Sequence, residues 1–344
     1  MADIVIADDG IAFDGRSAAA SPIGGAESAL VGLAEALARR GHRVAVRNNC
    51  AAPLEHAGVA WRPLADGMPR TADLYIANRG DKLLRLVPAA RRTVFWIHNP
   101  ASYLLKWRYL WKLAWRRPVI VFSGASHAST YPRWAPAGGR RVIPYGIAET
   151  FRTAVPAAEP PPPRAVFTSN PLRGLDWLLD RWEREIRPAV PNAELHVFSG
   201  PGTYGAVGLG KAARMRPVLE RAAALAGAGV VPHEPVPRAA LAERLREMRV
   251  YLYRGDPGET FCASAGEAQA MGIPAVVQDI GSLSERVSDG VTGFIAGDEA
   301  AFSAAAIRLL TEDALWRAQH AAALKTKRQF GWDEAAVEFE ALLA

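Results

Sequence analysis

One stretch near the C-terminus decides the fold. It spans Gly258–Pro274 and reads GETFCASAGEAQAMGIP. A short apolar run, residues 250–253, precedes it, and another, residues 275–277, follows it. The order is therefore strand, tight loop, helix, strand, which is typical of one unit of a parallel α/β sheet. We expect Glu259 in the loop and Glu267 inside the helix.

These two carboxylates are eight positions apart, with small residues between them. Both are expected at the C-terminal edge of a parallel sheet, where open α/β folds bind ligands. A carboxylate accepts hydrogen bonds from two neighbouring hydroxyls, so the pair suits a polyhydroxylated ligand. The alternative interpretation is that Ser264 and Glu267 only form a helix capping box. That alternative leaves Glu259 and the exit Gly-Ile-Pro unexplained.

The rest of the chain repeats the alternation of strands and helices, which predicts doubly wound parallel sheets. A proline-rich segment, residues 151–164, divides two such series and reads as a stiff extended linker. Further strands are predicted at 3–7, 43–47, 73–77, 93–97, 119–122, 165–168 and 195–198, and helices at 26–40, 175–185, 238–248 and 332–343.

Composition restricts the class of protein. The 344 residues are 50% apolar, enough for two domains with their own cores. No run of about 18 apolar residues occurs, so no membrane-spanning helix is expected. The acidic N-terminus enters a strand directly and does not resemble a signal peptide, and the chain has 2 cysteines. We therefore expect a cytoplasmic protein.

The net charge of +6 is unevenly distributed, because every charged residue from Lys82 to Ala148 is basic. Within this region, 103–117 predicts an amphipathic helix with Trp107, Trp111 and Trp115 at four-residue spacing. Such a helix suits the headgroup layer of an anionic membrane. The alternative is a helix that buries its tryptophans in the core and leaves its cations in water. On this helix, Leu104, Leu110 and Ala114 are expected beside the tryptophans, and Arg108, Lys112 and Arg116 are expected in an adjacent stripe.

Nucleic acid is the other anionic partner to consider. No nucleic-acid-binding motif is present, so nucleic acid is not the expected partner.

The Glu259-x7-Glu267 pattern, with its strand context and Gly-x-Pro exit, resembles the signature of retaining nucleotide-sugar glycosyltransferases of family 4, the glycosyl transferases group 1 type. This resemblance implies the GT-B fold: two Rossmann-like doubly wound parallel-sheet domains with a cleft between them. The domains implied are an acceptor or membrane domain at 1–150, the linker at 151–164, a donor domain at 165–328, and a C-terminal helix at 329–344 that crosses back to the first domain.

The same resemblance implies roles for particular residues. Catalytic roles fall to His98, Arg173 and Glu259, with His98 at the C-terminal end of a strand and Arg173 in a diphosphate clamp. Glu267 is expected on the ribose of the nucleotide, and the segment around His233 on its base. Gly24-Gly25 precede a helix whose N-terminal amides can hold phosphate oxygens. The remaining donor contacts are expected from the backbone of Thr260, Phe261, Cys262 and Ala263.

The clamp departs from the family pattern in one respect. Relatives carry a second cation a few residues before the position of Arg173, and here that position holds Ser169 or Asn170. Lys211 or Arg254 are the candidates for the missing charge. A purely structural reading remains open for a lone histidine such as His98, for a Gly-Gly turn, and for a solvated loop arginine.

The implied function is retaining transfer of a hexose-type sugar from a UDP- or GDP-linked donor to a lipid-linked or glycan acceptor, in cell-envelope polysaccharide or glycolipid synthesis. No Asp-x-Asp motif occurs, so no metal or other cofactor is expected. The implied location is the inner face of the plasma membrane, as a peripheral protein. Two alternatives stay open: an inactive nucleotide-sugar-binding scaffold, and another GT-B enzyme such as a nucleotide-sugar epimerase. A phosphorylase would need a pyridoxal lysine, and no lysine fits.

Overall fold

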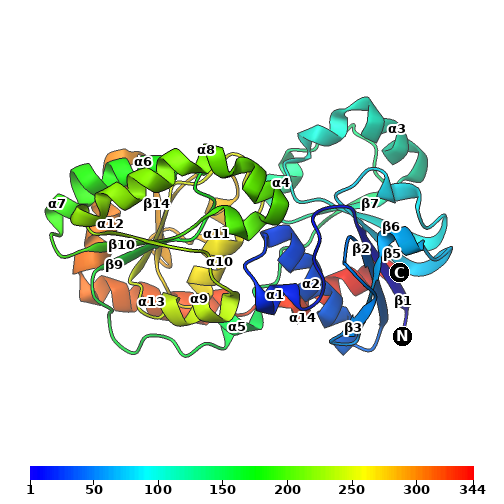
Figure 1. The fold of residues 1–344 in the computed structure, drawn as a ribbon, viewed down its shortest axis with the longest axis horizontal. Coiled ribbons are helices and arrows are strands. Elements are labelled where there is room, and N and C mark those ends of the chain that lie inside the picture. The colour runs from blue at the N-terminus through cyan, green and yellow to red at the C-terminus, as the bar shows by residue number, and fades with distance from the viewer. The chain divides into compact units, whose positions relative to one another are not determined.

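The computed structural model describes the backbone of residues 1–344 and the side chains of residues 1–202 and 210–344. The chain divides into two compact units. The first unit comprises residues 1–20, 25–146 and 330–344, and the second comprises residues 21–24 and 147–329. Figure 1 shows that each unit is built around its own sheet with helices on both faces.

The first unit contains an eight-stranded sheet in the order β3-β4-β2-β1-β5-β6-β7-β8. All neighbouring strands are parallel except β3 and β4. The strands are β1 (Asp3–Asp8), β2 (Arg43–Asn48), β3 (Leu54–His56), β4 (Val59–Pro63), β5 (Thr71–Asn78), β6 (Ala89–Trp96), β7 (Val119–Phe122) and β8 (Gly139–Val142). The chain winds outward from β1 to β2 on one side and to β5 on the other, so the topological switch point lies between β1 and β5.

The helices of the first unit are α1 (Ser17–Ala20), α2 (Gly25–Arg39), α3 (Trp107–Arg116), α4 (Ala125–Ser129) and α14 (Trp332–Glu340), with 3-10 turns at Leu64–Asp66, Leu83–Arg85, Ala101–Leu105 and Ala341–Leu343. The apolar periodicity of α2 buries Leu30, Leu33 and Leu37, and Gly41, at φ 88°, ends the helix with a left-handed residue. The sequence thus predicted α2 to within one residue at each end.

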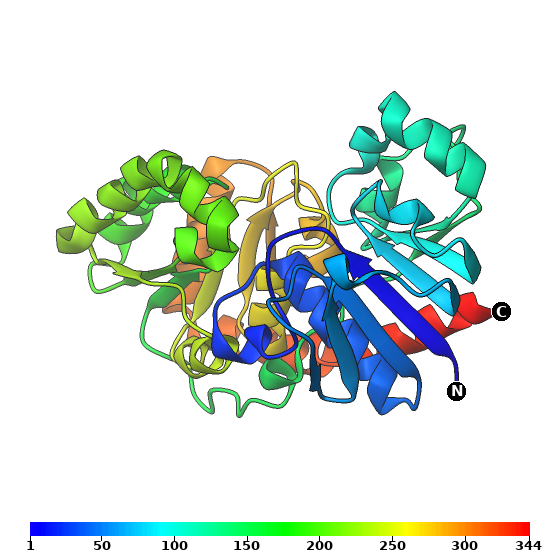
Figure 2. The same cartoon turned by 45° about the vertical axis from the view of Figure 1, so that its right-hand side comes forward.

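The C-terminal helix α14 packs against α2 (Figure 2). Asp333 pairs with Arg39 at 2.7 Å, and Glu340 pairs with Arg40 at 2.5 Å. Trp332 occupies the space over Gly32, where an added Cβ would lie 2.5 Å from the indole nitrogen. The glycine is therefore required for this close approach.

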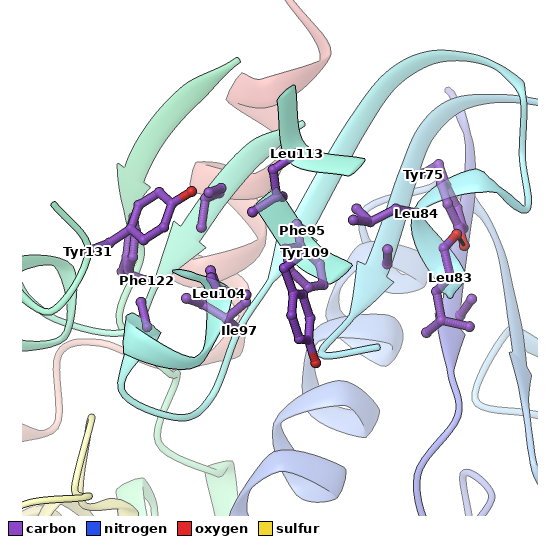
Figure 3. Close-up of a cluster of buried hydrophobic side chains, with 14 of the residues drawn as sticks. Tyr75, Leu83, Leu84, Phe95, Ile97, Leu104, Tyr109, Leu113, Phe122 and Tyr131 are labelled. Carbon is purple, nitrogen blue, oxygen red and sulfur yellow. Dashed lines mark hydrogen bonds between the residues drawn. The ribbon is translucent and has the colours of Figure 1, made fainter. Parts of the chain in front are cut away.

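A hydrophobic cluster fills the first unit beneath α3 (Figure 3). Tyr109 and Leu113 of α3 project onto it, and Phe95, Phe122 and Tyr131 lie among its other members. Ala72, Tyr75 and Ala77 of β5, Ile120 of β7, and Val5 and Ala7 of β1 also belong to it, and the turns between strands supply further members such as Leu83, Leu84 and Leu104.

The second unit contains a six-stranded, wholly parallel sheet in the order β11-β10-β9-β12-β13-β14. Its strands are β9 (Arg164–Phe167), β10 (Glu194–Phe198), β11 (Val230–His233), β12 (Val250–Tyr253), β13 (Ala275–Gln278) and β14 (Gly293–Ala296). The winding reverses between β9 and β12, which makes this the switch point of the second sheet.

In Figure 1, α6 and α8 lie on one face of this sheet, and α9 and α13 lie on the other. The helices are α5 (Glu149–Arg152), α6 (Leu175–Arg181), α7 (Arg187–Ala189), α8 (Gly205–Ala224), α9 (Arg238–Leu245), α10 (Ala263–Ala270), α11 (Leu283–Arg286), α12 (Glu299–Thr311) and α13 (Asp313–Lys327), with a π-helical turn at Trp182–Ile186 and 3-10 turns at Pro201–Tyr204 and Leu225–Ala228. A short helix, α5, occupies the start of the segment predicted as extended linker.

Candidate functional site

Glu259 lies in the loop after β12, at the switch point of the second sheet, as the sequence predicted. Its Oε1 atom accepts hydrogen bonds from Tyr253 Oη at 2.9 Å and from Arg173 Nη1 at 2.5 Å. The side chain is 10% exposed. Both of these hydrogen bonds go to Oε1, so among the described residues the Oε2 atom is the carboxylate oxygen that is left to accept from a ligand.

Arg173 reaches this carboxylate from the loop after β9, the strand that borders β12. Burial lowers the pKa of its guanidinium, but the facing Glu259 carboxylate more than offsets this and holds the pKa above its usual range. Asp256 Oδ1 lies 4.0 Å from Arg173 Nε. The side chain of Arg173 is 36% exposed, so this charged guanidinium can bind an anion through its remaining donors.

The position at which relatives carry a second cation holds Ser169 or Asn170 here, and the candidates for the missing charge are Arg254 and Lys211. Ser169 accepts a hydrogen bond from Ser199 through its carbonyl, and Asn170 Oδ1 accepts one from the Leu172 amide. Arg254 stacks over the Trp177 ring at 5.3 Å, directly beside Gly174, and Lys211 is exposed on α8. Arg254 is therefore adjacent in the fold to the loop that carries Arg173.

Glu267 lies inside α10, as predicted, and it forms an ion pair that the sequence did not suggest. Its Oε1 atom accepts a hydrogen bond from Nε of Arg238, at the start of α9, at 3.1 Å. Nη2 of Arg238 lies at the same distance from this oxygen. Burial raises the pKa of this carboxyl, and the Arg238 charge acts in the opposite direction. The capping-box alternative is wrong: α10 has Cys262 at its N-cap, and Ser264 instead contacts Tyr251 Oη at 2.8 Å.

The segment between the two glutamates is held tightly. Thr260, Phe261 and Cys262 are buried, whereas Ala263 is partly exposed at the first turn of α10. Cys262 adopts a left-handed conformation with φ 61°, which is uncommon for a non-glycine residue and marks a constrained turn. Burial raises the pKa of its thiol to about 12, so the thiol is protonated at neutral pH. The first amides of α10 have no intrahelical acceptor because they begin the helix.

His233 lies at the C-terminal end of β11, on the outer edge of the second sheet. Its ring stacks on Phe198 with centroids 4.2 Å apart, and its Nε2 lies 3.0 Å from Nδ1 of His196. Burial lowers the pKa of His233, with a further contribution from His196. The His233 ring therefore packs against Phe198 and His196. The prediction that the segment around His233 holds the nucleotide base stays a prediction.

In the first unit, His98 follows β6 and belongs to a buried hydrogen-bonded network. Its Nε2 lies 2.5 Å from Asn78 Oδ1, and its Nδ1 bonds the Tyr145 hydroxyl. Burial lowers the pKa of His98 well below its usual value, and the charge of Arg79 lowers it further. The ring is therefore neutral at pH 7.

Gly25 begins α2, and its surroundings are open: an added Cβ would meet nothing within 4 Å. Gly24 precedes it and is buried. In the first turn of the helix, Glu27 Oε1 accepts a hydrogen bond from Arg79 Nη2 at 2.9 Å. This ion pair fixes the start of α2 to the end of β5.

Comparison with known proteins identifies the second unit. Residues 162–312 match the family described as glycosyl transferases group 1. Residues 162–312 form a glycosyl transferases group 1 domain. This group 1 domain carries Arg173, Glu259 and Glu267, which all lie within the matched residues.

The chain is also similar to individual proteins. A D-inositol 3-phosphate glycosyltransferase from Streptomyces griseus is 36% identical over 168 residues, 48% of this chain and 33% of the relative. The chain thus matches about a third of that relative's length. Sucrose-phosphate synthase from Thermosynechococcus elongatus superposes with a TM-score of 0.74 at 18% identity, covering 99% of this chain and 98% of the other. HepE from Anabaena, solved with UDP and glucose, gives a TM-score of 0.72 at 15% identity, covering 100% and 99%. The fold is GT-B, as expected.

Outside the group 1 domain, α3 presents tryptophans to solvent. Trp107 is 77% exposed, Trp111 41% and Trp115 62%, so the alternative in which they enter the core is wrong. The helix begins at Trp107, one turn later than predicted, because Ala101–Leu105 forms a 3-10 turn and buries Leu104. Two residues of the predicted cationic stripe have partners within the protein. Lys112 forms an ion pair with Asp81 at 2.5 Å, and Arg116 donates a hydrogen bond to the Val87 carbonyl at 3.4 Å. Ala114 is exposed beside the tryptophans, whereas Leu110 is half-buried.

Two absences hold for the described residues. Apart from the side chains of 203–209, no group of three or more His, Cys, Asp or Glu side chains is arranged to bind a metal. Across the same residues, none of the helices combines the length and apolar character needed to cross a membrane.

Several site residues were missed by the sequence analysis. Tyr253 and Arg238 contact the two predicted glutamates. Asn78 contacts His98, and Asp8 bonds in turn to Asn78 and Arg79. Tyr253, Asp8 and Asn78 are the last residues of their strands, which places them at the edge where α/β folds bind ligands. That position was the available signal.

Proposed function

We propose that this chain is a retaining glycosyltransferase that moves a hexose-type sugar from a UDP- or GDP-linked donor. The observation that carries the proposal is the meeting of Glu259 and Arg173 at the switch point of a group 1 domain. One group accepts hydrogen bonds from hydroxyls and the other binds phosphate. A nucleotide-diphosphate sugar presents both kinds of group next to each other.

The roles of the residues follow from their chemistry. Glu259 Oε2 accepts from hydroxyls of the sugar, and Glu267 accepts from the ribose. The leaving group is a diphosphate whose charge grows as the glycosidic bond breaks. Arg173 and the first amides of α10, near Ala263, stabilise that charge within the second unit. No divalent ion is required in this proposal.

The comparisons support the nature of the donor. HepE was solved with UDP and glucose, and a neighbour from Escherichia coli was solved with UDP-2-fluoro glucose. The relative from Streptomyces griseus is named for transfer to D-inositol 3-phosphate. A hydroxylated acceptor, glycan or lipid-linked, is consistent with these names.

The tryptophans of α3 favour an acceptor at a membrane surface. Three exposed indoles lie on a helix whose buried face, Tyr109 and Leu113, already fixes it to the core. Arg108 is exposed beside them, and the region 82–148 carries no acidic residue that would repel an anionic lipid. We place the protein peripherally at the inner face of the plasma membrane, on a lipid-linked acceptor of cell-envelope synthesis.

The direct test is release of nucleotide from a panel of UDP-, GDP- and dTDP-sugars, with and without EDTA. We expect slow hydrolysis of one donor, unchanged by EDTA, with Arg173→Ala as the inactive control. Turnover that requires an added divalent ion would contradict metal independence. Failure of every donor to bind would contradict the proposal itself.

One observation favours a second candidate, an inactive nucleotide-sugar-binding scaffold. Ser169 and Asn170 place no second cation in the loop that carries Arg173, and Glu259 partly neutralises Arg173 itself. A single neutralised cation stabilises a leaving group less than two free ones. Tight donor binding without turnover, in the presence of a hydroxylated acceptor, would support this candidate over the enzyme.

A further inference from the structure

The first unit exposes a fourth tryptophan outside α3. Trp134 is 72% exposed, and it lies in the loop that joins α4 to β8. Its neighbour Arg133 is exposed as well. Single exposed apolar side chains are common on protein surfaces, so exposure alone assigns no role to this residue. The construction of its loop is the feature that points to a function.

Arg140, in β8, holds this loop in one shape. Its guanidinium donates to the backbone carbonyls of Pro132 at 2.7 Å and Ala135 at 2.9 Å. It also donates to the carbonyls of Tyr131 and Arg133, each at 3.2 Å. A guanidinium has five donors in a rigid fork, so one side chain can bind several carbonyls at once. The turn that carries the exposed indole is therefore fixed from inside.

The loop is also joined to the core and to α3. Tyr131 and Ala135 belong to the buried cluster that contains Leu113 of α3, and Figure 3 labels Tyr131 and Leu113 within it. At the other end of the loop, an added Cβ at Gly138 would lie 1.8 Å from the carbonyl oxygen of Arg117, the residue that ends α3. The loop thus contacts the C-terminal end of the helix that carries the other exposed tryptophans.

The chain around Trp134 is basic. Arg117, Arg133 and Arg141 are exposed, and residues 82–148 contain no acidic side chain. Indole rings concentrate at the interface between lipid and water, and an anionic leaflet attracts cations that lie near it. An indole held outward on a fixed loop and bordered by arginines therefore complements an anionic lipid surface in both apolar character and charge.

We propose that the loop of residues 131–138 is a second membrane-contact element, in which Trp134 enters the headgroup layer of an anionic lipid surface and Arg133 binds lipid phosphate. Arg140 is a positioning residue, because its donors are used within the loop. This inference rests on the membrane part of the proposed function. It extends that part: the first unit meets the lipid at two places, α3 and this loop, so its orientation on the surface is fixed.

A fluorophore at position 134 tests the contact directly. Trp134→Cys is labelled with nitrobenzoxadiazole, whose emission shifts to the blue in an apolar environment. The native Cys50 and Cys262 are 5% and 3% exposed, so the reagent reacts at position 134. We expect a blue shift on vesicles that contain phosphatidylglycerol. Val337→Cys, labelled on α14, is the control and should show no shift. An unshifted label at position 134 on protein that sediments with the vesicles would overturn the inference.

The unlabelled variants measure what the loop contributes to binding. Trp134→Ser should weaken binding to the same vesicles by about tenfold. Arg140→Lys keeps the charge and removes the fork, so it should also weaken binding, because the turn loses its carbonyl contacts. Arg91→Lys makes the same replacement at an exposed position of β6 and should bind like the wild type. Wild-type binding by Arg140→Lys would overturn the positioning role.

The outcomes separate this inference from the proposed function. If replacing the three tryptophans of α3 weakens vesicle binding and Trp134→Ser does not, the inference fails and the role of α3 stands. If the wild-type protein binds no anionic vesicle, the membrane part of the proposed function fails together with the inference, whereas release of nucleotide from a donor would still support the glycosyltransferase. A concentration-dependent dimer that is lost in Trp134→Ser would show that the loop binds a second copy, and it would overturn the lipid assignment.

Discussion

Nη1 of Arg173 lies 2.5 Å from Oε1 of Glu259, so the group proposed to bind phosphate and the group proposed to bind sugar hydroxyls already contact each other. The pair joins loops that are 86 residues apart in the chain. Each partner fixes the position of the other. The hydroxyl of Tyr253 also donates a hydrogen bond to the Glu259 carboxylate and helps to hold it in place. The donor therefore meets two groups whose spacing is set in advance, which reduces the ordering cost of binding.

The first prediction concerns the charge of Glu259. Glu259→Gln keeps the shape of the side chain and its acceptor oxygen but removes the negative charge that faces Arg173. We expect turnover to fall by about 100-fold or more, because the sugar loses a charged acceptor and Arg173 loses its alignment. Steady-state kinetics with the best donor measure the loss, and a thermal melt shows that the fold is kept.

Glu247→Gln serves as the control for this variant. Glu247 pairs with Arg164 at 2.9 Å in the same unit, but its side chain is 56% exposed and it lies away from the switch point. We expect wild-type turnover in Glu247→Gln. Wild-type turnover in Glu259→Gln as well would remove Glu259 from the proposed site.

The sequence predicted the elements of the site better than the contacts of its residues. Apolar runs and small loop residues placed Glu259 in a loop and Glu267 in a helix, because those signals are local. The partner of Glu267 is Arg238, 29 residues away, and nothing local distinguishes Arg238 from other helical arginines. The pairing depends on how α9 and α10 pack on the sheet, which is a property of the whole unit.

The same limit applies to the basic region of the first unit. The spacing of Trp107, Trp111 and Trp115 correctly predicted one helical face, and the charge pattern placed Lys112 in a basic stripe without indicating its partner. Asp81 stands just before the acid-free segment and pairs with Lys112 across the fold. Likewise, Asp8 and Asn78 are 70 residues apart and meet only because β1 and β5 are neighbours in the sheet.

The second prediction concerns the tryptophans of α3. Replacing Trp107, Trp111 and Trp115 together by Ser should weaken binding to vesicles that contain anionic phosphatidylglycerol by at least about tenfold. The thermal melt should change little, because these side chains are exposed and the helix is anchored by Tyr109 and Leu113. Vesicle sedimentation measures the binding.

Val337→Ser is the control, since Val337 is an apolar side chain of the same unit that is 45% exposed on α14. It should leave vesicle binding unchanged. Undiminished binding by the triple variant would contradict a membrane role for α3. Binding that is equal on neutral and anionic vesicles would remove the electrostatic part of the proposal.

The third prediction concerns Cys262. Burial raises the pKa of this thiol to about 12, so at pH 8 only about one molecule in 10,000 carries the reactive thiolate. Iodoacetamide should therefore leave Cys262 unmodified in the folded protein and modify it after denaturation, as followed by mass spectrometry. Cys262→Ala should keep turnover within about threefold. Rapid alkylation of the folded protein, or an inactive Cys262→Ala that still folds, would indicate a chemical role for the thiol.

The last prediction concerns Gly281, which lies beneath the loop that carries Glu259. Its φ of 66° disfavours any other residue, and an added Cβ would lie 2.7 Å from the Asp256 carbonyl oxygen and 3.0 Å from Glu259 Cβ. Gly281→Ala must therefore displace the loop as well as strain its own backbone. We expect a loss of stability of about 2 kcal/mol, together with at least tenfold lower turnover.

Gly290→Ala separates these two effects. Gly290 has nearly the same backbone conformation, with φ 70°, but an added Cβ there meets nothing within 4 Å. This variant should therefore show only the cost of the left-handed conformation, about 1 kcal/mol, with wild-type turnover. Denaturant unfolding and steady-state kinetics on both variants give the comparison. Of these two glycines, Gly281 is the one at which an added Cβ would meet the Glu259 loop. Equal turnover in the two variants would therefore mean that the position of Glu259 does not limit the reaction.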